Sequence, residues 1–300
     1  MACPNGHFFA YANDTDVPVF ASEPEGSNEY SQENAAEFHD NALRWVFNTF
    51  QADEDVLRER LIARIGLMAG ERVLITGAGA GNDLPYLVRA LGGKGEVYVQ
   101  DIAKEMLLAG VSRYKSGLEG SGVALHFSVS DATNLPFNDG FFDAAYHFGG
   151  INLFPDIAKG IAEMNRVVKS GGSIVIGDEG LAPWLVGTEL GRMLINNNAL
   201  YACTAPLEAL PATVRDVKLS WELSNCFYVI EFQASTEPLP IDIDVPHIGK
   251  RGGTIRSRYF GRMEGVTPEL RDRIYEEAER RGVSRVAFLE SALRAALDRE

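Results

Sequence analysis

Three glycines at alternate positions could bring the backbone of this chain close to a ligand. Gly77, Gly79 and Gly81 lie in the segment VLITGAGAGND (73–83), after an apolar run typical of a strand and before a run typical of a helix. Glycine lets the backbone approach a ligand closely, and the N-terminus of the following helix offers N–H groups without helical partners. The segment therefore predicts a turn that binds a ligand through its backbone.

The spacing of these glycines distinguishes three kinds of ligand-binding turn. A dinucleotide fingerprint needs GxGxxG, but the third glycine, Gly81, comes one residue early and Asn82 stands in its place. A short-chain dehydrogenase loop would match Thr76-Gly77, yet none of the ten tyrosines is followed four residues later by the lysine that such an enzyme needs. The remaining GxGxG spacing resembles motif I of the class I S-adenosylmethionine-dependent methyltransferases.

Three further segments resemble the same superfamily in the same order. VQDIAKEML (99–107) is similar to the family's vDiSpeML, SDATNLPFNDGFFD (130–143) to gDaenLPFpdnsFD, and EMNRVVKSGGSIVI (163–176) to its helix and Gly-Gly turn. The resemblance covers about residues 70–233. Within the superfamily, this part of the chain most resembles ubiquinone/menaquinone-biosynthesis C-methyltransferases and related small-molecule enzymes. It implies S-adenosylmethionine as cofactor, with Asp101 on the ribose diol and Asp131 on the adenine amino group. The cofactor residues that it implies are Gly77, Ala78, Gly79, Gly81, Asp83, Asp101, Ile102, Met106, Asp131, Ala132 and His147.

One position departs from the family pattern. An acidic residue usually stands two positions before the first glycine of motif I, and here that position is Ile75. The methionine ammonium of the cofactor would therefore lack its usual carboxylate neighbour. Asp83, in the loop that leads to the next helix, is the substitute that we expect.

Candidates for catalysis follow the fourth and fifth predicted strands, because reacting groups gather beyond the carboxyl ends of an open α/β sheet. His147 has a pKa range suited to a general base, or it is a histidine hydrogen-bonded beside the cofactor. Asp178 and Glu179 could orient an acceptor or take its proton, or they cap the helix that follows. The expected reaction is in-line methyl transfer to a carbon, oxygen or nitrogen atom of a small molecule.

Residues expected to contact that small molecule come from several segments. Asn152 follows the fourth strand, and it either binds substrate or caps a helix. Trp184 and Tyr201 are candidates for an aromatic pocket wall, with ordinary core packing as the alternative. Arg256 and Arg258 in the C-terminal tail could meet an anionic substrate. Only five histidines and no His/Cys cluster lead us to expect no metal site.

The alternation of strand-like and helix-like segments along the chain predicts an α/β fold that positions these residues. Strands are expected at 72–76, 96–101, 124–131, 141–148 and 172–179, alternating with helices at 84–91, 103–114 and 155–168. This alternation indicates a Rossmann-like, mostly parallel sheet with helices on both faces. Runs at 217–223 and 226–233, two residues apart, predict an antiparallel hairpin at the sheet edge.

Two helices are expected before this sheet, at 33–50 and 54–65. Together they form a helical lid over the cofactor. The first of them carries apolar residues on one face, which we expect to point inward. That face consists of Phe38, Ala42, Trp45, Val46 and Thr49.

Composition and charge limit the partners, the location and the segments that we expect for this chain. The 300 residues hold 28 Lys+Arg against 42 Asp+Glu, and the net charge of −14 argues against general attraction to nucleic acid or anionic membranes. No apolar run reaches the roughly 20 residues of a membrane span, and the first 43 residues lack the basic residues of a leader peptide. Three cysteines form no disulfide framework, so we expect a cytoplasmic protein. The expected segments are an irregular acidic arm (1–32), the lid (33–68), a methyltransferase domain (69–234), a linker (235–250) and a tail (251–300).

The tail is expected to form a strand at 253–261 and two helices. Thr267 and Ser284 can cap these helices, and Gly282 can end the first. The strand–helix–helix order resembles the ribbon-helix-helix fold, in which two chains pair their strands. We expect the tail to mediate a homodimer, ahead of substrate contact or DNA binding. Two alternatives to an enzyme stay open: a non-catalytic S-adenosylmethionine-binding protein, suggested by Ile75, and a DNA-associated protein that uses the tail.

Overall fold

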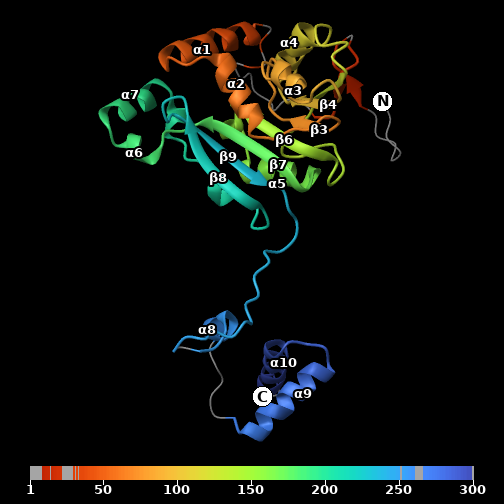
Figure 1. Ribbon diagram of the computed structural model, residues 1–300, viewed down its shortest axis with the longest axis vertical. Helices are drawn as coiled ribbons and strands as arrows, with labels where there is room; N and C mark the ends of the chain where they lie inside the picture. Colours follow the sequence, from red (N-terminus) through yellow and green to blue (C-terminus); the bar gives the residue numbers. More distant parts are fainter. Residues whose placement is uncertain are drawn as a thin grey trace. The chain divides into compact units, whose positions relative to one another are not determined.

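A computed structural model describes residues 9–13, 15–21, 30, 32, 34–250, 252–260 and 266–298. The described residues divide into two compact units on either side of the Leu239–Pro240 bond. The larger, N-terminal unit contains a single sheet, which Figure 1 shows between layers of helices.

The sheet has nine strands among the described residues, in the order β1-β2-β5-β4-β3-β6-β7-β9-β8. Their bounds are Ala10–Tyr11 (β1), Pro18–Val19 (β2), Arg72–Ile75 (β3), Gly95–Asp101 (β4), Val123–Val129 (β5), Phe142–Phe148 (β6), Val168–Glu179 (β7), Arg215–Glu222 (β8) and Phe227–Gln233 (β9). Strands β5, β4, β3, β6 and β7 pair in parallel, whereas β9 runs antiparallel to both β7 and β8. The predicted mostly parallel α/β sheet with an antiparallel edge hairpin is confirmed.

Apolar residues on both faces of the central strands explain why helices cover both sides. In β3, Val73 and Ile75 belong to one buried cluster and Leu74 to another. Side chains alternate between the two faces of a strand, so the two clusters lie on opposite faces of the sheet. Figure 1 shows α1 to α4 on one side and α5 on the other.

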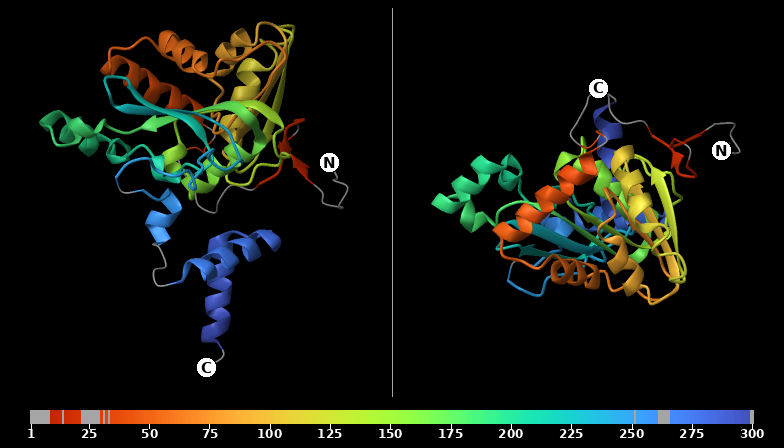
Figure 2. Two further views of the ribbon diagram at one scale, coloured as in Figure 1. Left: turned by 60° about the horizontal axis from the view of Figure 1, so that its bottom comes forward. Right: turned by 90° about the horizontal axis from the view of Figure 1, so that it is seen from above.

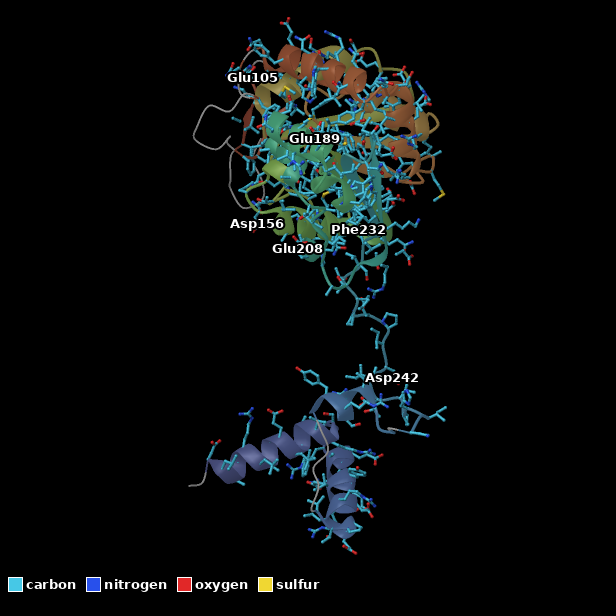
Figure 3. All side chains as sticks on the ribbon, turned by 90° about the vertical axis from the view of Figure 1, so that its left-hand side faces the viewer. Glu105, Asp156, Glu189, Glu208, Phe232 and Asp242 are labelled. Carbon is cyan, nitrogen blue, oxygen red and sulfur yellow. The ribbon has the colours of Figure 1, made fainter. Side chains whose placement is uncertain are left out.

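The helices of the larger unit are α1 (Ala35–Thr49), α2 (Glu54–Ala63), α3 (Leu84–Ala90), α4 (Lys104–Tyr114), α5 (Ile157–Val167), α6 (Pro183–Val186) and α7 (Glu189–Asn197). Side chains cap three of these helices, α2, α5 and α7. Asp53 caps α2 and Asp156, labelled in Figure 3, caps α5, each accepting a hydrogen bond from a backbone N–H of the first turn. Short 3₁₀ turns occupy Ile151–Leu153, Ala199–Ala202 and Leu207–Ala209.

The prediction for the inward face of α1 is wrong. Phe38 is 60% exposed and Trp45 is 47% exposed. The buried residues of α1 are Ala35, Ala36 and Phe47. The two alanines pack against the glycine turn and α4 in a small cluster with Ala80, Ala103 and Met106. Because α1 carries apolar residues on two sides, periodicity could not decide which side meets the sheet.

The arm predicted to be irregular at 1–32 also differs from the structure where it is described. Strands β1 and β2 pair with each other, and Val19 of β2 pairs in parallel with Val129 of β5. Ala12 and Val17 are buried there. The arm therefore extends the sheet beyond β5. Residues 1–8, 14, 22–29 and 31 of that prediction lie outside the described part.

The smaller unit contains α8 (Ile255–Phe260), α9 (Pro268–Arg280) and α10 (Arg285–Leu297). A helix at 255–260 contradicts the predicted strand at 253–261, whose last residue is not described. Thr254 and Ser257 exchange hydrogen bonds between backbone N–H groups and side-chain oxygens (3.1 and 2.8 Å), which starts a helical turn in place of a strand. The caps predicted for the other two helices are confirmed, since Thr267 and Ser284 accept hydrogen bonds from Leu270 and Ala287.

Candidate functional site

The glycine turn joins β3 to α3 at the carboxyl end of the parallel strands. Gly77, Gly79 and Gly81 have φ angles of +57°, +54° and +79°, a region that side chains disfavour. A Cβ added to Gly77 would lie 2.7 Å from Cε1 of His147, and one added to Gly81 would lie 2.9 Å from Leu84. Glycine is therefore required at these positions by both conformation and space.

Two carboxylates lie at the ends of the neighbouring strands. Asp101 ends β4, and its oxygens accept hydrogen bonds from the N–H groups of Gly79 (2.7 Å) and Ala103 (2.8 Å). Asp131 follows β5 and accepts from the N–H and hydroxyl of Thr133 (2.7 and 2.9 Å). A carboxylate has about four lone-pair sites, so both side chains can accept further hydrogen bonds from a ligand.

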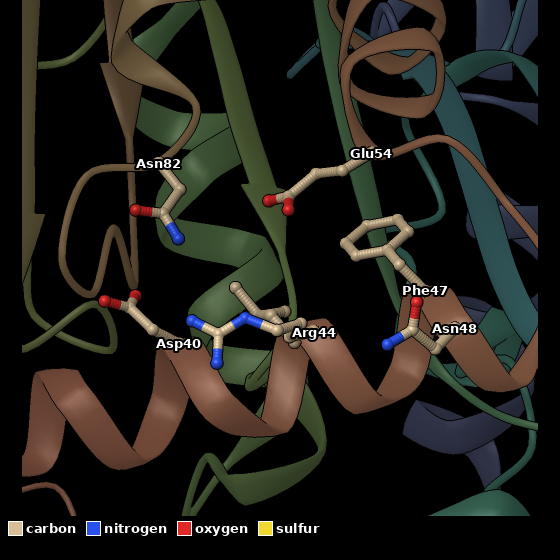
Figure 4. A pocket seen from close by; sticks show the side chains of 7 residues that line it. Asp40, Arg44, Phe47, Asn48, Glu54 and Asn82 are labelled. Carbon is tan, nitrogen blue, oxygen red and sulfur yellow. The ribbon is translucent and has the colours of Figure 1, made fainter.

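A pocket opens beside the glycine turn, between it and the first two helices (Figure 4). Its volume is about 280 Å³. Its walls come from α1, from the start of α2 and from the end of the turn. The lining residues are Asp40, Leu43, Arg44, Phe47, Asn48, Glu54 and Asn82.

Asp83, the predicted substitute for an acid at Ile75, is already paired with a cation. Its Oδ1 lies 2.7 Å from Nη1 of Arg58, and both side chains are buried. Arg58 also contacts Glu54 (2.7 Å) within α2. Burial lowers the pKa of Arg58, but the two carboxylates outweigh it and raise that pKa above its ordinary value. Arg58 therefore fastens α2 to the glycine turn as a permanent cation.

His147 lies beside the glycine turn, where a cofactor would bind. It is fully buried, its Nδ1 is 3.1 Å from Oγ1 of Thr76, and its ring meets Phe154 edge to face. Burial lowers the pKa of His147, so the ring is neutral at pH 7. Of the two interpretations left open by the sequence, this geometry matches a histidine that packs beside the cofactor.

Asp178 uses its buried carboxylate to shape the loop after β6. Its Oδ2 accepts from the N–H groups of Gly150 (3.1 Å) and Asn152 (2.7 Å), and its Oδ1 from that of Glu179 (2.8 Å). The side chain of Asn152 then donates to the carbonyl of Glu179 (2.7 Å) and accepts from the hydroxyl of Tyr228 (2.9 Å). Asp178 and Asn152 therefore hold the ends of β6 and β7 together.

Glu179 ends β7 and is partly buried beside this network. Burial and the neighbouring Asp178 raise the pKa of Glu179 to about 9. Burial, and then the negative charges of Asp178 and Glu179, also raise the pKa of the Cys203 thiol. Tyr201 is 1% exposed and packs edge to face against Phe50 and Phe227. The end of β7 therefore presents a carboxylic acid that is neutral at pH 7 next to aromatic side chains.

Trp184, a predicted substrate residue, does not join this group. Trp184 is 61% exposed on α6 and contacts Trp221 edge to face. Figure 2 shows α6 and α7 projecting away from the sheet. In the smaller unit, Arg256 pairs with Asp244 (2.8 Å) and Arg258 donates to the carbonyl of Gly252 (2.9 Å). The two arginines are thus occupied within their own unit.

Sequence reasoning missed the polar groups that the first two helices contribute. Arg44 and Glu54 line the pocket, and Arg58 pairs with Glu54. One signal was present in the sequence: Arg58 shares a helical face with Leu61 and Ile62, three and four residues on. A charged residue on a buried face requires a buried partner of opposite charge, and here that partner is Asp83.

The remaining predicted cofactor residues surround the turn. The N–H of Ala78 donates to the carbonyl of Gln100 (3.0 Å), and Met106 and Ala132 are buried nearby, whereas Ile102 is partly buried. Oγ of Ser130 and Nε2 of His147 are two of five buried side-chain polar atoms that have no partner among the described residues. Because both residues are fully buried, these two atoms do not face the pocket. The carboxylates of Asp101 and Asp131, at the strand ends, are the groups that fit the hydroxyl and amino groups of a nucleoside.

The part of the chain that the structure describes contains no cluster of three or more His, Cys, Asp or Glu side chains placed to hold a metal ion. None of its helices combines the length and the apolar character needed to cross a bilayer.

Curated relatives match the central part of the chain. Residues 74–176 match the family model described as a methyltransferase domain. The chain is 32% identical over 160 residues to the ubiquinone/menaquinone biosynthesis C-methyltransferase UbiE of Bordetella avium, covering 52% of this chain and 60% of that protein. It is 33% identical over 118 residues to the demethylmenaquinone methyltransferase of a Geobacillus species, covering 39% and 49%. The chain thus spans about half the length of the curated relatives that it matches.

Solved structures share the fold at lower identity. The phosphoethanolamine N-methyltransferase 2 of Haemonchus contortus, in complex with S-adenosyl-L-methionine, matches with a TM-score of 0.53 at 16% identity, covering 72% of this chain and 61% of that one. The [4+2]-cyclase SpnF matches with a TM-score of 0.50 at 16% identity, covering 72% and 100%. Since one neighbour is a cyclase, the fold alone does not assign the reaction.

The sheet order, the glycine turn and the carboxylates at the strand ends define a Rossmann-like α/β protein with a nucleoside-type cofactor site. Residues 74–176 match the methyltransferase domain family. This match and the methyltransferase relatives over the same part of the chain support the class I S-adenosylmethionine-dependent methyltransferase superfamily that the motifs predict.

Proposed function

We propose that this protein transfers the methyl group of S-adenosylmethionine to a small-molecule acceptor. The observation that carries the proposal is the link between the glycine turn and Asp101, in which the Gly79 N–H donates to the Asp101 carboxylate at 2.7 Å. This link holds the carboxylate of Asp101, the proposed acceptor for the ribose diol, beside the backbone of the turn at the carboxyl ends of β3 and β4. The matches to methyltransferase relatives over the same residues support it.

The proposed cofactor contacts follow the order of the strands. The turn from Gly77 to Gly81, with Ala78, lies against the methionine part, and Asp101 accepts hydrogen bonds from the ribose hydroxyls. Ile102 and Met106 flank the adenosine, while Asp131 and Ala132 meet the adenine. The ring of His147 packs against Gly77. Asp83 acts through Arg58 and holds the turn in place.

The bound cofactor would supply a methyl group on a positively charged sulfur, which the acceptor atom displaces in line. The chain's contribution is alignment of the acceptor, which can supply much of the rate. We propose that Glu179 contacts the acceptor, since it ends β7 at the carboxyl edge of the sheet and is only partly buried. Tyr201 is 1% exposed and belongs to the core, so it supports this region from behind and does not contact the acceptor. Asp178 and Asn152 are positioning residues, because their contacts hold the loops on which the acceptor would lie.

Release of S-adenosylhomocysteine from the full chain, measured by mass spectrometry with pools of candidate acceptors, tests this proposal. We expect turnover with at least one pool, and Asp101→Ala should weaken cofactor binding by about tenfold to a hundredfold, since charged hydrogen bonds contribute roughly 1.5–3 kcal/mol. Cofactor binding without turnover in any pool would favour the non-catalytic alternative. Unchanged binding in Asp101→Ala would refute the assigned ribose contact.

We also propose that the smaller unit pairs with a second copy of the chain. Its helices α9 and α10 bury one residue, Ala278, among those described. Their apolar side chains Leu270, Leu293 and Leu297 are 44%, 46% and 73% exposed. A unit of about 60 residues is only marginally stable by itself, so covering these side chains would stabilise it.

Light scattering of the full chain tests this pairing. A dimer that Leu293→Lys/Leu297→Lys converts to a monomer would support it, and a wild-type monomer would refute it. A salt-dependent shift with duplex DNA would favour the DNA-associated alternative. We keep the cytoplasm as the proposed location, supported by the free thiols of Cys203 and Cys226.

A further inference from the structure

The pocket beside the glycine turn combines charges of both signs. Asp40 and Arg44 face it from α1, Glu54 from the start of α2, and Asn82 from the last part of the turn. Figure 4 shows the guanidinium of Arg44 and the carboxylate of Glu54 directed into the same space. A pocket of this kind suits a ligand group that itself carries a positive and a negative charge.

Arg44 is available to hold an anion. Its Nη1 donates to the side-chain oxygen of Asn41 (2.8 Å), and it has no carboxylate partner among the described residues. Asp40, the nearest acid on the same helix face, is instead paired with both terminal nitrogens of Arg113 (3.0 and 2.7 Å). The positive charge of Arg44 in the pocket is therefore not compensated by Asp40.

Glu54 is available to hold a cation. Glu54 and Asp83 both contact Arg58, at 2.7 Å each, so the three side chains carry a net charge of −1. Asp83 is buried, whereas the side chain of Glu54 is 38% exposed and lines the pocket. The uncompensated negative charge of the group is therefore presented to the pocket by Glu54.

We propose that this pocket binds the α-amino acid end of S-adenosylmethionine, with Arg44 on the α-carboxylate and Glu54 on the α-ammonium. The inference rests on the proposed function, because it concerns the same cofactor. It explains how the chain can bind a zwitterionic end group although Ile75 supplies no charge and Asp83 is occupied by Arg58. The amino-acid end is then recognised by α1 and α2, and the adenosine by the sheet.

Calorimetric titrations with two pairs of nucleosides test the Arg44 and Glu54 contacts separately. S-Adenosylhomocysteine carries the amino-acid end and 5′-methylthioadenosine lacks it, while neither has a charged sulfur. S-Adenosylmethionine and its decarboxylated form share the sulfonium and the amine and differ in the carboxylate. The wild-type chain should bind the first member of each pair at least tenfold more tightly than the second.

Each variant should weaken a different subset of these ligands. Arg44→Met should weaken S-adenosylhomocysteine and S-adenosylmethionine by about tenfold to a hundredfold, the range for a charged hydrogen bond. It should leave the decarboxylated cofactor and methylthioadenosine within twofold of wild type. Glu54→Gln should weaken all three amine-bearing ligands and leave methylthioadenosine unchanged. Arg89→Met and Glu59→Gln, which break an exposed pair on α3 and α2, are matched controls that should change no affinity.

The outcomes distinguish this assignment from the proposed function. Equal binding of S-adenosylhomocysteine and methylthioadenosine by the wild type would refute the assignment and leave the proposed function standing. Equal weakening of every ligand, methylthioadenosine included, by Arg44→Met or Glu54→Gln would also overturn it, because the effect would not be local to the amino-acid end. Failure of a folded wild-type chain to bind any of the four nucleosides would refute both.

Discussion

The buried pair of Arg58 and Asp83 should make a large contribution to the stability of the larger unit. Arg58→Met keeps the length of the side chain and removes its charge. The side chains of Arg58 and Asp83 are 8% and 9% exposed, so the substitution leaves a buried carboxylate without a cation. Breaking a buried pair in this way costs about 3–5 kcal/mol.

The expected loss can be read as a shift in melting temperature. A change of 1 kcal/mol moves the midpoint of a domain of 150–250 residues by about 2–4 °C. Arg58→Met should therefore lower the midpoint of the full chain, followed by circular dichroism, by about 6–20 °C. Adding Asp83→Asn should recover part of this loss, because the unpaired charge is removed with its partner.

Arg89→Met supplies the matched control. Arg89 and Glu59 also join α3 to α2, but their side chains are 65% and 54% exposed. Exposed pairs contribute about 0–1 kcal/mol, so the control should lower the midpoint by less than about 4 °C. Equal midpoints for Arg58→Met and Arg89→Met would show that the buried pair does not hold α2 against the glycine turn.

Two further predictions concern the strand ends. Folding raises the pKa of Glu179 from 4.5 to about 9, so the folded chain keeps a proton that the unfolded chain releases. The free energy of unfolding should therefore fall by up to ~1.4 kcal/mol per pH unit as the pH rises between these values. Glu179→Gln should flatten this slope in urea denaturation, and an unchanged slope would contradict the raised pKa. Gly77→Ala should cost about 1–3 kcal/mol because its Cβ would lie 2.7 Å from His147. Gly187→Ala, with φ of −81° and no atom within 4 Å of the new Cβ, should be neutral in the same assay.

Features encoded by neighbouring residues could be predicted from the sequence. The glycine turn requires positive φ angles within five consecutive residues, and Asp101 ends a strand whose apolar pattern is plain. The order of strands and helices followed from their alternating periods. The fold class and the turn proposed to bind the cofactor could therefore be predicted from the sequence.

Features that depend on distant contacts could not be predicted. Arg58 and Asp83 are 25 residues apart, and nothing in their local sequence pairs them. The inward face of α1 is decided by close packing of Ala35 and Ala36 on the turn, which outweighs the larger apolar residue Phe38. The helix at 255–260 begins through two hydrogen bonds between Thr254 and Ser257, although the alternating pattern around them is typical of a strand.

Calorimetric titration of the full chain with S-adenosylmethionine tests the central claim most directly. The glycine turn and Asp101, which are linked by a hydrogen bond of 2.7 Å, predict saturable binding of one cofactor per chain. Absence of a binding signal at high micromolar cofactor, from a chain shown by circular dichroism to be folded, would contradict the account.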